Sequence, residues 1–340
     1  MDKRIKRLPA EWEAQSFTQF TFPHRDSDWA TTFEEVVACF VNCIDAIVAF
    51  QPVLVVCAKI DEVKNYLSHL DQSKIDYVEL PSNDTWARDH GGITIEENGR
   101  LMLIDFKFNG WGLKFPANFD NLLIRRLWEL NKFQNADFFS KNFVLEGGSI
   151  ESDGAGTLLT TSECLLSPNR NPEFNKVEIE AHLKDFFGLK RVLWLDHGAL
   201  EGDDTNAHID TLARFCDEKT IAYVQCQDER DSHFNSLQKM EQQLRQFRTL
   251  SGDPYRLLPL PMPQAIYDED GQRLPATYAN FLFVNNGLIV PTYGVPQDEE
   301  ALHIFKLLFP KRKVVGVNCR ALIVQHGSLH CITMQYSQGV

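Results

Sequence analysis

The chain has 340 residues, of which 44% are hydrophobic and 24% are charged, a composition typical of soluble globular proteins. Its 34 basic and 47 acidic residues give a formal net charge of -13, which argues against nucleic acid or an anionic membrane as a partner. A length of 340 residues fits either one large domain or two ordinary ones.

The cysteines indicate reduced, buried thiols rather than a disulfide framework or a zinc cluster. None of the eight forms a Cys-x-x-Cys pair, and most lie inside apolar runs such as residues 53–57. Residues 1–7 are basic but lead into a proline and two glutamates instead of an apolar signal region. No apolar run approaches transmembrane length. We therefore expect a cytoplasmic protein.

The first 80 residues alternate between strand and helix patterns. An aromatic-rich strand is predicted at 17–22, followed by a helix at 30–50 with apolar residues at helical spacing. A buried strand at 53–58, a shorter helix at 61–70 and a strand at 77–80 come next. This rhythm predicts an α/β or α+β fold.

A hairpin followed by an amphipathic helix then recurs along the chain. Each predicted hairpin contains turn residues that suit antiparallel strands. The hairpins cover residues 91–106, 147–161, 208–225 and 278–292, and the helices cover 118–131, 174–187, 233–247 and 297–309. With the first strand and helix and a last strand at 329–335, they predict five or so αβ modules around an axis, each of roughly 50 to 70 residues. Because no linker interrupts the pattern, we expect a single domain spanning 1–340.

Unusual polar and aromatic residues stand at the entrances of these modules. They are Trp86 and Asp89, then Glu146, then Asp204, His208 and Asp210, and finally Cys331. If the modules are related by rotation, the entrances converge on one axial pocket. His208 and Asp210, two residues apart on a predicted strand, would point to the same face.

Taken singly, these residues also have structural interpretations. Asp89 beside Arg88 can be a surface ion pair, His208 a structural histidine satisfied by Asp210, and Cys331 a core residue. Together they favour nucleophilic catalysis on a planar cation, because two carboxylates can clamp a guanidinium and hold its carbon near a thiolate. Since ionised carboxylates raise the pKa of a thiol, we expect the bound cation to help activate Cys331.

Several motifs, in chain order, resemble those of agmatine deiminases within the Porphyromonas-type peptidylarginine deiminase family. They are Trp-Ala-Arg-Asp at 86–89, Asn-Gly-Trp-Gly at 109–112, Glu-Gly-Gly at 146–148, Gly-Asp-Asp-Thr-x-x-His-x-Asp at 202–210 and His-Gly-Ser-x-His-Cys-x-Thr-x-Gln at 326–335. The resemblance covers essentially the whole chain. It implies a pentein fold, which is a five-bladed α/β propeller with a central active-site channel. It also implies hydrolysis of agmatine to N-carbamoylputrescine and ammonia, a C–N hydrolase reaction of putrescine synthesis, without metal or organic cofactor.

The resemblance implies a role for each matching residue. Cys331 would attack the guanidinium carbon. His208 would protonate the departing ammonia and then activate water against a covalent thiouronium intermediate. Asp89 and Asp210 would clamp the guanidinium nitrogens, and Glu146 would orient His208.

The far end of the substrate is less well defined by the motifs. Trp86 would line its alkyl part, and Trp111 is a further candidate for binding it. Asp204 stands where related enzymes often carry a glutamate that faces the distal amine, and Ala207 replaces a glycine. The shorter carboxylate leaves the choice of agmatine over another guanidine open.

His326 and His330 receive no role in this scheme. His330 is adjacent to Cys331, yet a strand would place the two side chains on opposite faces.

Four alternatives remain open. The chain could be a peptidylarginine or other guanidine deiminase, an amidino-group transferase, or a non-catalytic pentein that serves as a binding protein. His208, Asp210 and Cys331 are also suitable ligand types for zinc, although they lack the local spacing of a zinc motif. The sequence does not indicate whether the chain forms a homo-oligomer.

Overall fold

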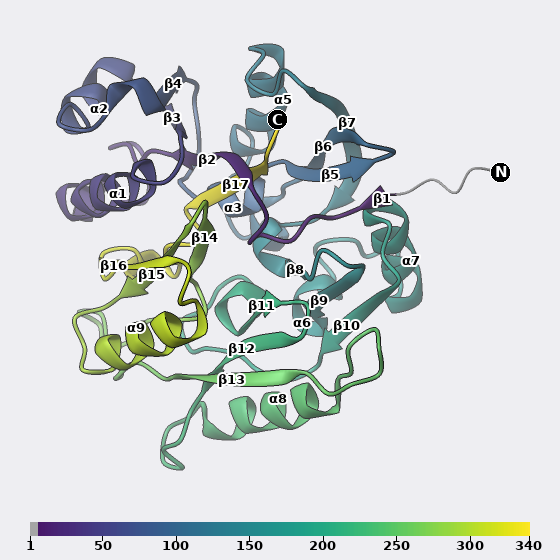
Figure 1. Ribbon diagram of the computed structural model, residues 1–340. Coiled ribbons are helices and arrows are strands. Elements are labelled where there is room, and N and C mark those ends of the chain that lie inside the picture. Colours follow the sequence, from purple (N-terminus) through teal and green to yellow (C-terminus); the bar gives the residue numbers. More distant parts are fainter. Residues whose placement is uncertain (1–5) are drawn as a thin grey trace.

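The computed structural model describes residues 6–340, which form five small sheets with the longer helices at the periphery (Figure 1). The first five residues of the basic N-terminal segment lie outside the described residues. Each sheet belongs to a module of the same kind. In every module two antiparallel strands are followed by a helix, and the helix leads to a third strand that runs parallel to the second. The expected five αβ modules are therefore confirmed.

Four modules follow one another along the chain. The first contains β5 (Ile93–Glu97), β6 (Arg100–Lys107), α5 (Asp120–Glu129) and β7 (Ala136–Val144), with β1 (Lys6–Arg7) at the sheet edge. The second contains β8 (Ile150–Ser152), β9 (Thr157–Thr161), α7 (Lys176–Phe187) and β10 (Arg191–Leu195). The third contains β11 (Ala213–Asp217), β12 (Thr220–Gln225), α8 (Phe234–Gln246) and β13 (Arg256–Pro261). The fourth contains β14 (Leu282–Val284), β15 (Gly287–Thr292), α9 (Gln297–Leu308) and β16 (Lys313–Asn318).

The fifth module joins the two ends of the chain. It contains β17 (Thr333–Ser337), β2 (Gln15–Thr21), α1 (Phe33–Val48) and β3 (Val53–Cys57), extended by α2 (Ile60–Tyr66) and β4 (Ile75–Glu79). β17 pairs antiparallel with β2, with Thr333 opposite Phe20. This pairing closes the ring of modules and places the segment that carries Cys331 beside the N-terminal strand.

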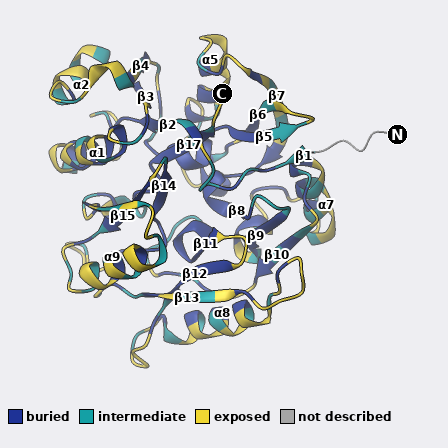
Figure 2. Cartoon of the chain, in the orientation of Figure 1, coloured by how far each residue is buried: buried dark blue, intermediate teal, exposed yellow. Residues whose placement is uncertain are grey.

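Burial follows the amphipathic pattern of the sequence. In α1 the buried positions recur at helical spacing, as at Val36, Phe40, Ile44 and Ile47, so one face of the helix packs on its sheet. Figure 2 shows exposed residues on the outer faces of α1, α2, α8 and α9, and buried residues in the strands nearer the centre. Within residues 6–340, no helix is long and apolar enough to span a membrane.

Several expected strands begin later than the sequence pattern suggested. The first strand of the hairpin expected at 278–292 begins only at Leu282. Residues 209–211 form a short 3₁₀ helix, η4 (Ile209–Thr211), ahead of β11, so the prediction that His208 and Asp210 lie on a strand is wrong. Cys331 lies in turns that precede β17 and not at the start of a strand. The physical reason is visible at Cys331, whose N–H bonds to a side-chain oxygen of Asn280 instead of to a neighbouring strand.

Candidate active site

All five module entrances contribute a side chain to the centre of the ring. They are Asp89 on α3 (Ala87–His90), Glu146 before η3 (Gly147–Ser149), His208 and Asp210 at η4, Asn280 before β14, and Cys331 before β17. A cavity at this point is lined by Trp86, Asp89, Trp111, Asp204, His208 and Cys331, among others. Glu146 and Asp210 are fully buried behind this lining. The predicted site residues therefore come together, from segments far apart in the sequence.

The Cys331 thiol is held at the base of the cavity by its backbone. Oδ1 of Asn280 accepts hydrogen bonds from the N–H groups of His330 (2.8 Å) and Cys331 (3.4 Å). The Cys331 carbonyl accepts a bond of 3.0 Å from the N–H of Arg88. The Cys331 Sγ lies 3.5 Å from Asn280 Oδ1 and 4.0 Å from Asp210 Oδ2. The nucleophile candidate is therefore fixed on one side by an amide and on the other by a carboxylate.

The resting thiol of Cys331 is protonated. Burial is the largest of the effects that raise the pKa of Cys331 well above its ordinary value, and the carboxylates of Asp210 and Asp89 raise it further. A cation bound between those carboxylates would act in the opposite direction. The pocket thus favours a thiolate only when a positive group occupies it.

His208 carries a proton at neutral pH. Burial lowers its pKa, but the charges of Asp89, Cys164 and Glu146 act in the opposite direction. Their effect is larger and raises the pKa of His208 to about 10. Asp89 Oδ1 lies 3.6 Å from His208 Nδ1. Among the residues described, its Nε2 is buried without a hydrogen-bond partner. An imidazolium in this place can donate a proton to a leaving group.

Gly148 allows three functional groups to meet at one point. A Cβ atom there would lie 2.7 Å from His208 Nδ1, 2.8 Å from Asp89 Oδ1 and 3.1 Å from Asp210 Oδ2. The Gly148 N–H also donates a bond of 3.1 Å to Asp89 Oδ1, while Trp111 Nε1 donates one of 2.9 Å to Asp89 Oδ2. The close approach, and not a special backbone conformation, requires glycine here.

His330 lies directly behind Asp210, so the expectation that its side chain points away from the site needs correction. Its Nδ1 is 2.8 Å from Asp210 Oδ2, and its Nε2 is 2.6 Å from Oε2 of Glu11. The reason is local: Cys331 is not on a strand, so alternation between two faces does not apply to its neighbour. Over residues 6–340, the second oxygen of Asp210 has no partner, which leaves it free to accept a bond from a ligand.

Opposing effects act on the pKa of His330, and the net effect is to lower it. Both ring nitrogens face carboxylate oxygens, an arrangement that only an imidazolium can satisfy at both nitrogens. Burial and the guanidinium groups of Arg214 and Arg88 lower the pKa of His330. Arg214 also binds Glu11 at 2.8 Å. For Asp210, burial raises the pKa, but the hydrogen bond and charge of His330 outweigh it, so the pKa of Asp210 is lowered.

Glu146 is bound by an arginine that the motifs did not reveal. Arg170 Nε lies 2.9 Å and 3.1 Å from the two Glu146 oxygens, and both side chains are buried. Arg170 also donates to Asn206 Oδ1 (2.9 Å) and to the Thr205 carbonyl (2.7 Å), which anchors the loop that carries Asp204. The ligand atoms of Glu146 and His208 lie within 4.8 Å of each other, without a direct hydrogen bond. The orienting role of Glu146 stays a prediction.

The cavity lining also contains the remaining predicted residues, Trp86 and Asp204. Trp86 packs against Gly327, where an added Cβ would lie 2.1 Å from its ring. Burial raises the pKa of Asp204, although His326 opposes the rise. Asp28 and Asp84 also line this region, which is therefore acidic. Such an entrance suits a ligand with a second positive charge.

Ala207 has a left-handed backbone conformation, with φ of 58°. This conformation favours glycine, which agrees with the resemblance noted above. Here Asp203 holds the alanine in place by accepting a bond of 2.6 Å from its N–H.

The zinc alternative does not fit the observed geometry. In residues 6–340, three groups of His, Cys, Asp or Glu residues bring their ligand atoms within 4.8 Å of one another, and none combines His208, Asp210 and Cys331. One group, Glu146, Cys164 and His208, overlaps the site.

Asn280 and Arg170 are the residues of the site that sequence reasoning missed, whereas Gly148 and His330 were noted in the motifs but received no role. Asn280 stands ahead of the fourth hairpin, in the position that carries Asp89, Glu146 or Cys331 in other modules. The positional rule did not single it out, because the predicted hairpin began at residue 278. Only the later start of β14, at Leu282, places Asn280 at a module entrance.

Comparisons with known proteins agree with this geometry. The family model described as Porphyromonas-type peptidyl-arginine deiminase matches residues 7–337. An agmatine deiminase of Pseudomonas aeruginosa (strain UCBPP-PA14) is 34% identical over 352 residues, covering 97% of this chain and 95% of the relative. A substrate-bound C. jejuni agmatine deiminase with a cysteine-to-serine substitution is 39% identical, with a TM-score of 0.93 and coverage of 100% of this chain and 98% of that chain. A structure from Porphyromonas gingivalis, provisionally named an arginine deiminase, is 50% identical, with a TM-score of 0.95 and coverage of 98% and 99%.

Proposed function

Because the chain belongs to the Porphyromonas-type peptidyl-arginine deiminase family, we propose that it is an agmatine deiminase. It hydrolyses the guanidinium group of agmatine to give N-carbamoylputrescine and ammonia. Relatives named agmatine deiminase, at 34% and 39% identity over nearly the whole chain, support this choice.

The convergence of Cys331, His208, Asp89 and Asp210 around Gly148 is the observation that carries the proposal. The two carboxylates bind the guanidinium N–H groups and keep its plane fixed. The second oxygen of Asp210 is unoccupied by any of the described residues and is available for this contact. Charge-assisted bonds of this kind combine strength with geometric selection.

In the first half-reaction, the bound cation lowers the pKa of Cys331, and the thiol proton leaves to solvent. The thiolate then forms a C–S bond to the guanidinium carbon. The C–N bond breaks as His208 transfers its proton to the departing nitrogen, which leaves as ammonia. The product of this half is a thiouronium on Cys331, and His208 is now neutral.

In the second half-reaction, neutral His208 takes a proton from water. The water oxygen bonds to the thiouronium carbon, and cleavage of the C–S bond releases the Cys331 thiolate. The second proton of the water then passes from the ureido oxygen to this thiolate, and the neutral ureido product leaves. His208 and Cys331 return to their starting states. The same imidazole acts as the acid in the first half-reaction and as the base in the second. Asp89 lies beside it and stabilises the protonated form of His208.

The acidic entrance favours agmatine over neutral or zwitterionic guanidines. Asp204, Asp28 and Asp84 line the cavity, where they attract the distal ammonium of agmatine. Arginine carries a carboxylate at that end, which these residues would repel. Trp86 provides an apolar wall for the carbon chain.

Residues 1–340 act as one catalytic domain in this proposal, because every module contributes a residue to the site. A cytoplasmic location stays a prediction.

A steady-state colour assay for ureido groups tests the function. We expect kcat/KM for agmatine to exceed the values for free arginine and for an arginyl peptide by at least tenfold. Comparable or higher values for arginine or the peptide would refute the agmatine assignment. An added amine that diverted product from the ureido compound would identify an amidino transferase instead.

A further inference from the structure

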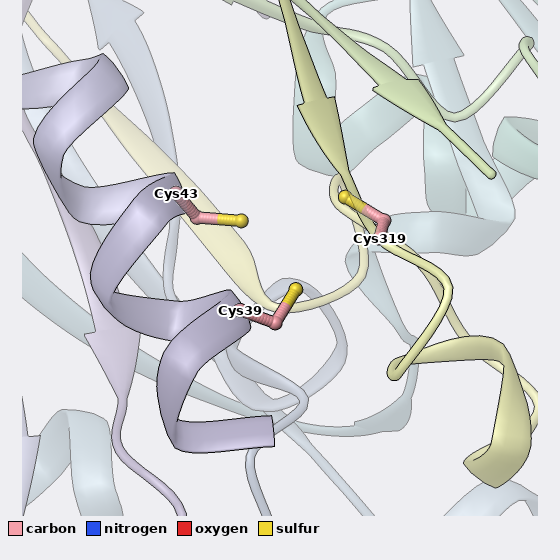
Figure 3. Close-up of side chains that lie close together, drawn as sticks. All are labelled: Cys39, Cys43 and Cys319. Atoms are coloured by element: carbon pink, nitrogen blue, oxygen red, sulfur yellow. The ribbon is translucent and has the colours of Figure 1, made fainter. Parts of the chain in front are cut away.

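Three cysteines that are not among the residues lining the catalytic cavity meet in the core. Cys39 and Cys43 lie on α1, and Cys319 follows the end of β16 directly. Their Sγ atoms all lie within 4.8 Å of one another. Figure 3 shows the three side chains pointing toward one another across the space between α1 and the segment after β16.

The secondary structure explains why the thiols converge. Cys39 and Cys43 are four residues apart on α1 and therefore share one face of the helix. That face packs on the region of β16, and the Cys319 N–H is fixed by a bond of 2.8 Å to the Thr292 carbonyl. The arrangement is thus held by two rigid elements from opposite ends of the chain.

The cluster differs from ordinary buried thiols in this protein. Cys43 and Cys319 are fully buried and Cys39 is 4% exposed. The Cys39 thiol donates a bond of 3.3 Å to the Asn318 carbonyl. By contrast, Cys57 and Cys216 are buried but belong to no such group within residues 6–340. A lone buried cysteine can be explained as a small apolar side chain that fills the core. That explanation does not account for three thiols that lie close to one another.

We propose that Cys39, Cys43 and Cys319 form a binding site for one thiophilic divalent metal ion of the Zn²⁺ and Cd²⁺ class. A metal–sulfur bond of about 2.3 Å in a trigonal arrangement places the sulfurs about 4.0 Å apart, which the observed spacing accommodates with little movement. Soft thiolate ligands select this class over Mg²⁺ or Ca²⁺, which prefer oxygen.

The apolar surroundings favour a complex of low net charge. A divalent ion bound by two thiolates and one neutral thiol is neutral, and its binding releases two protons to solvent. Affinity should therefore increase with pH.

A bound ion would connect two parts of the ring. α1 belongs to the module that contains the N-terminal strand, whereas Cys319 begins the segment that leads from β16 to Cys331. The metal would restrain that segment without contacting substrate, so it would stabilise the fold. This site is independent of the proposed function.

Cadmium is a suitable probe because thiolate-to-cadmium charge transfer absorbs in the ultraviolet. The measurement uses the reduced full chain with Cys331→Ser, which removes the catalytic thiol as a competing ligand. We expect one Cd²⁺ per chain by equilibrium dialysis, together with the charge-transfer band and a higher Tm. Protein produced in zinc-supplemented medium should retain zinc after dialysis.

Single Cys43→Ala and Cys319→Ala substitutions should each weaken Cd²⁺ binding at least tenfold. Cys57→Ala is the matched control, since it removes a buried thiol outside the cluster, and it should leave binding unchanged. Cys39→Ala repeats the test if another variant fails to fold by circular dichroism. Absence of both cadmium and zinc uptake would overturn the proposal, as would equal binding by the cluster variants and the control.

Discussion

Substitution of Gly148 by alanine should disable the enzyme through a single methyl group. The backbone of Gly148 is not in the left-handed region, so alanine can adopt its conformation without strain. The added Cβ would lie 2.7 Å from His208 Nδ1 and 2.8 Å from Asp89 Oδ1. Ordinary contacts need about 3.5 Å, so the imidazole or the carboxylate must move by about 0.8 Å.

Such a displacement is large on the scale of catalysis. A misplacement of about 1 Å can cost about a hundredfold in rate. We therefore expect kcat/KM for agmatine to fall about a hundredfold, equivalent to about 2.7 kcal/mol of transition-state stabilisation. The loss should include slower formation of the covalent adduct on Cys331, because the acid that expels ammonia is displaced.

The assay compares ureido product formation by the parent, Gly148→Ala and a control, with adduct formation followed by mass spectrometry. Gly316→Ala is the control: it lies on β16, and its Cβ would meet the Leu302 and Thr292 side chains at 3.2 Å. It adds the same methyl group away from the site and should keep nearly full activity. If the Gly148→Ala enzyme is folded and its kcat/KM for agmatine is within about threefold of the parent value, the close approach of His208, Asp89 and Asp210 at Gly148 is refuted.

Four further predictions test the other roles. Cys331→Ala should abolish turnover yet still bind agmatine in calorimetry; residual turnover would exclude Cys331 as the nucleophile. Asp210→Asn should raise KM and lower kcat, with a combined loss of about 1.5–3 kcal/mol, because a charge-assisted contact is removed; an unchanged KM would contradict its place in substrate binding. His330→Gln removes the group that lowers the pKa of Asp210, so the acidic limb of the kcat/KM profile should move to higher pH, and an unmoved limb would show that His330 does not act through Asp210. Because the pKa of His208 is higher in the folded state than its ordinary value of 6.5, protonation of His208 stabilises the folded protein. This stabilisation is complete at pH values below 6.5 and is lost as the pH rises through about 10. The difference in free energy of unfolding between the parent and His208→Gln should therefore shrink from pH 6 to pH 10 in urea titrations, and a constant difference would contradict the assignment.

The modular fold was predictable because hydrophobic periodicity is a local property. The helix over 30–50 and the four later hairpins and helices follow directly from apolar spacing and turn residues, and α1, α5, α7, α8 and α9 appear close to the predicted bounds. The pairing of β17 with β2 was not apparent from periodicity. It depends on contacts between residues at opposite ends of the chain.

The site was predictable to the extent that its residues occupy corresponding positions in repeated units. Asp89, Glu146, His208, Asp210 and Cys331 all precede the first strand of a module, and the structure brings them together. Their exact secondary structure was predicted wrongly at η4 and before β17. At these entrances, side chains bond the backbone in place of a neighbouring strand, so strand alternation loses its predictive value.

The amino-acid sequence by itself determined the module pattern, the family and the chemical types at the site. Only the tertiary structure decided that His330 supports Asp210, that Arg170 binds Glu146, and that Gly148 is the point where three groups meet. The reason is that propensity and spacing act between near neighbours. The role of a buried ion pair, or of a glycine without a Cβ, depends on groups that are distant in the sequence and that only folding brings within a few ångströms.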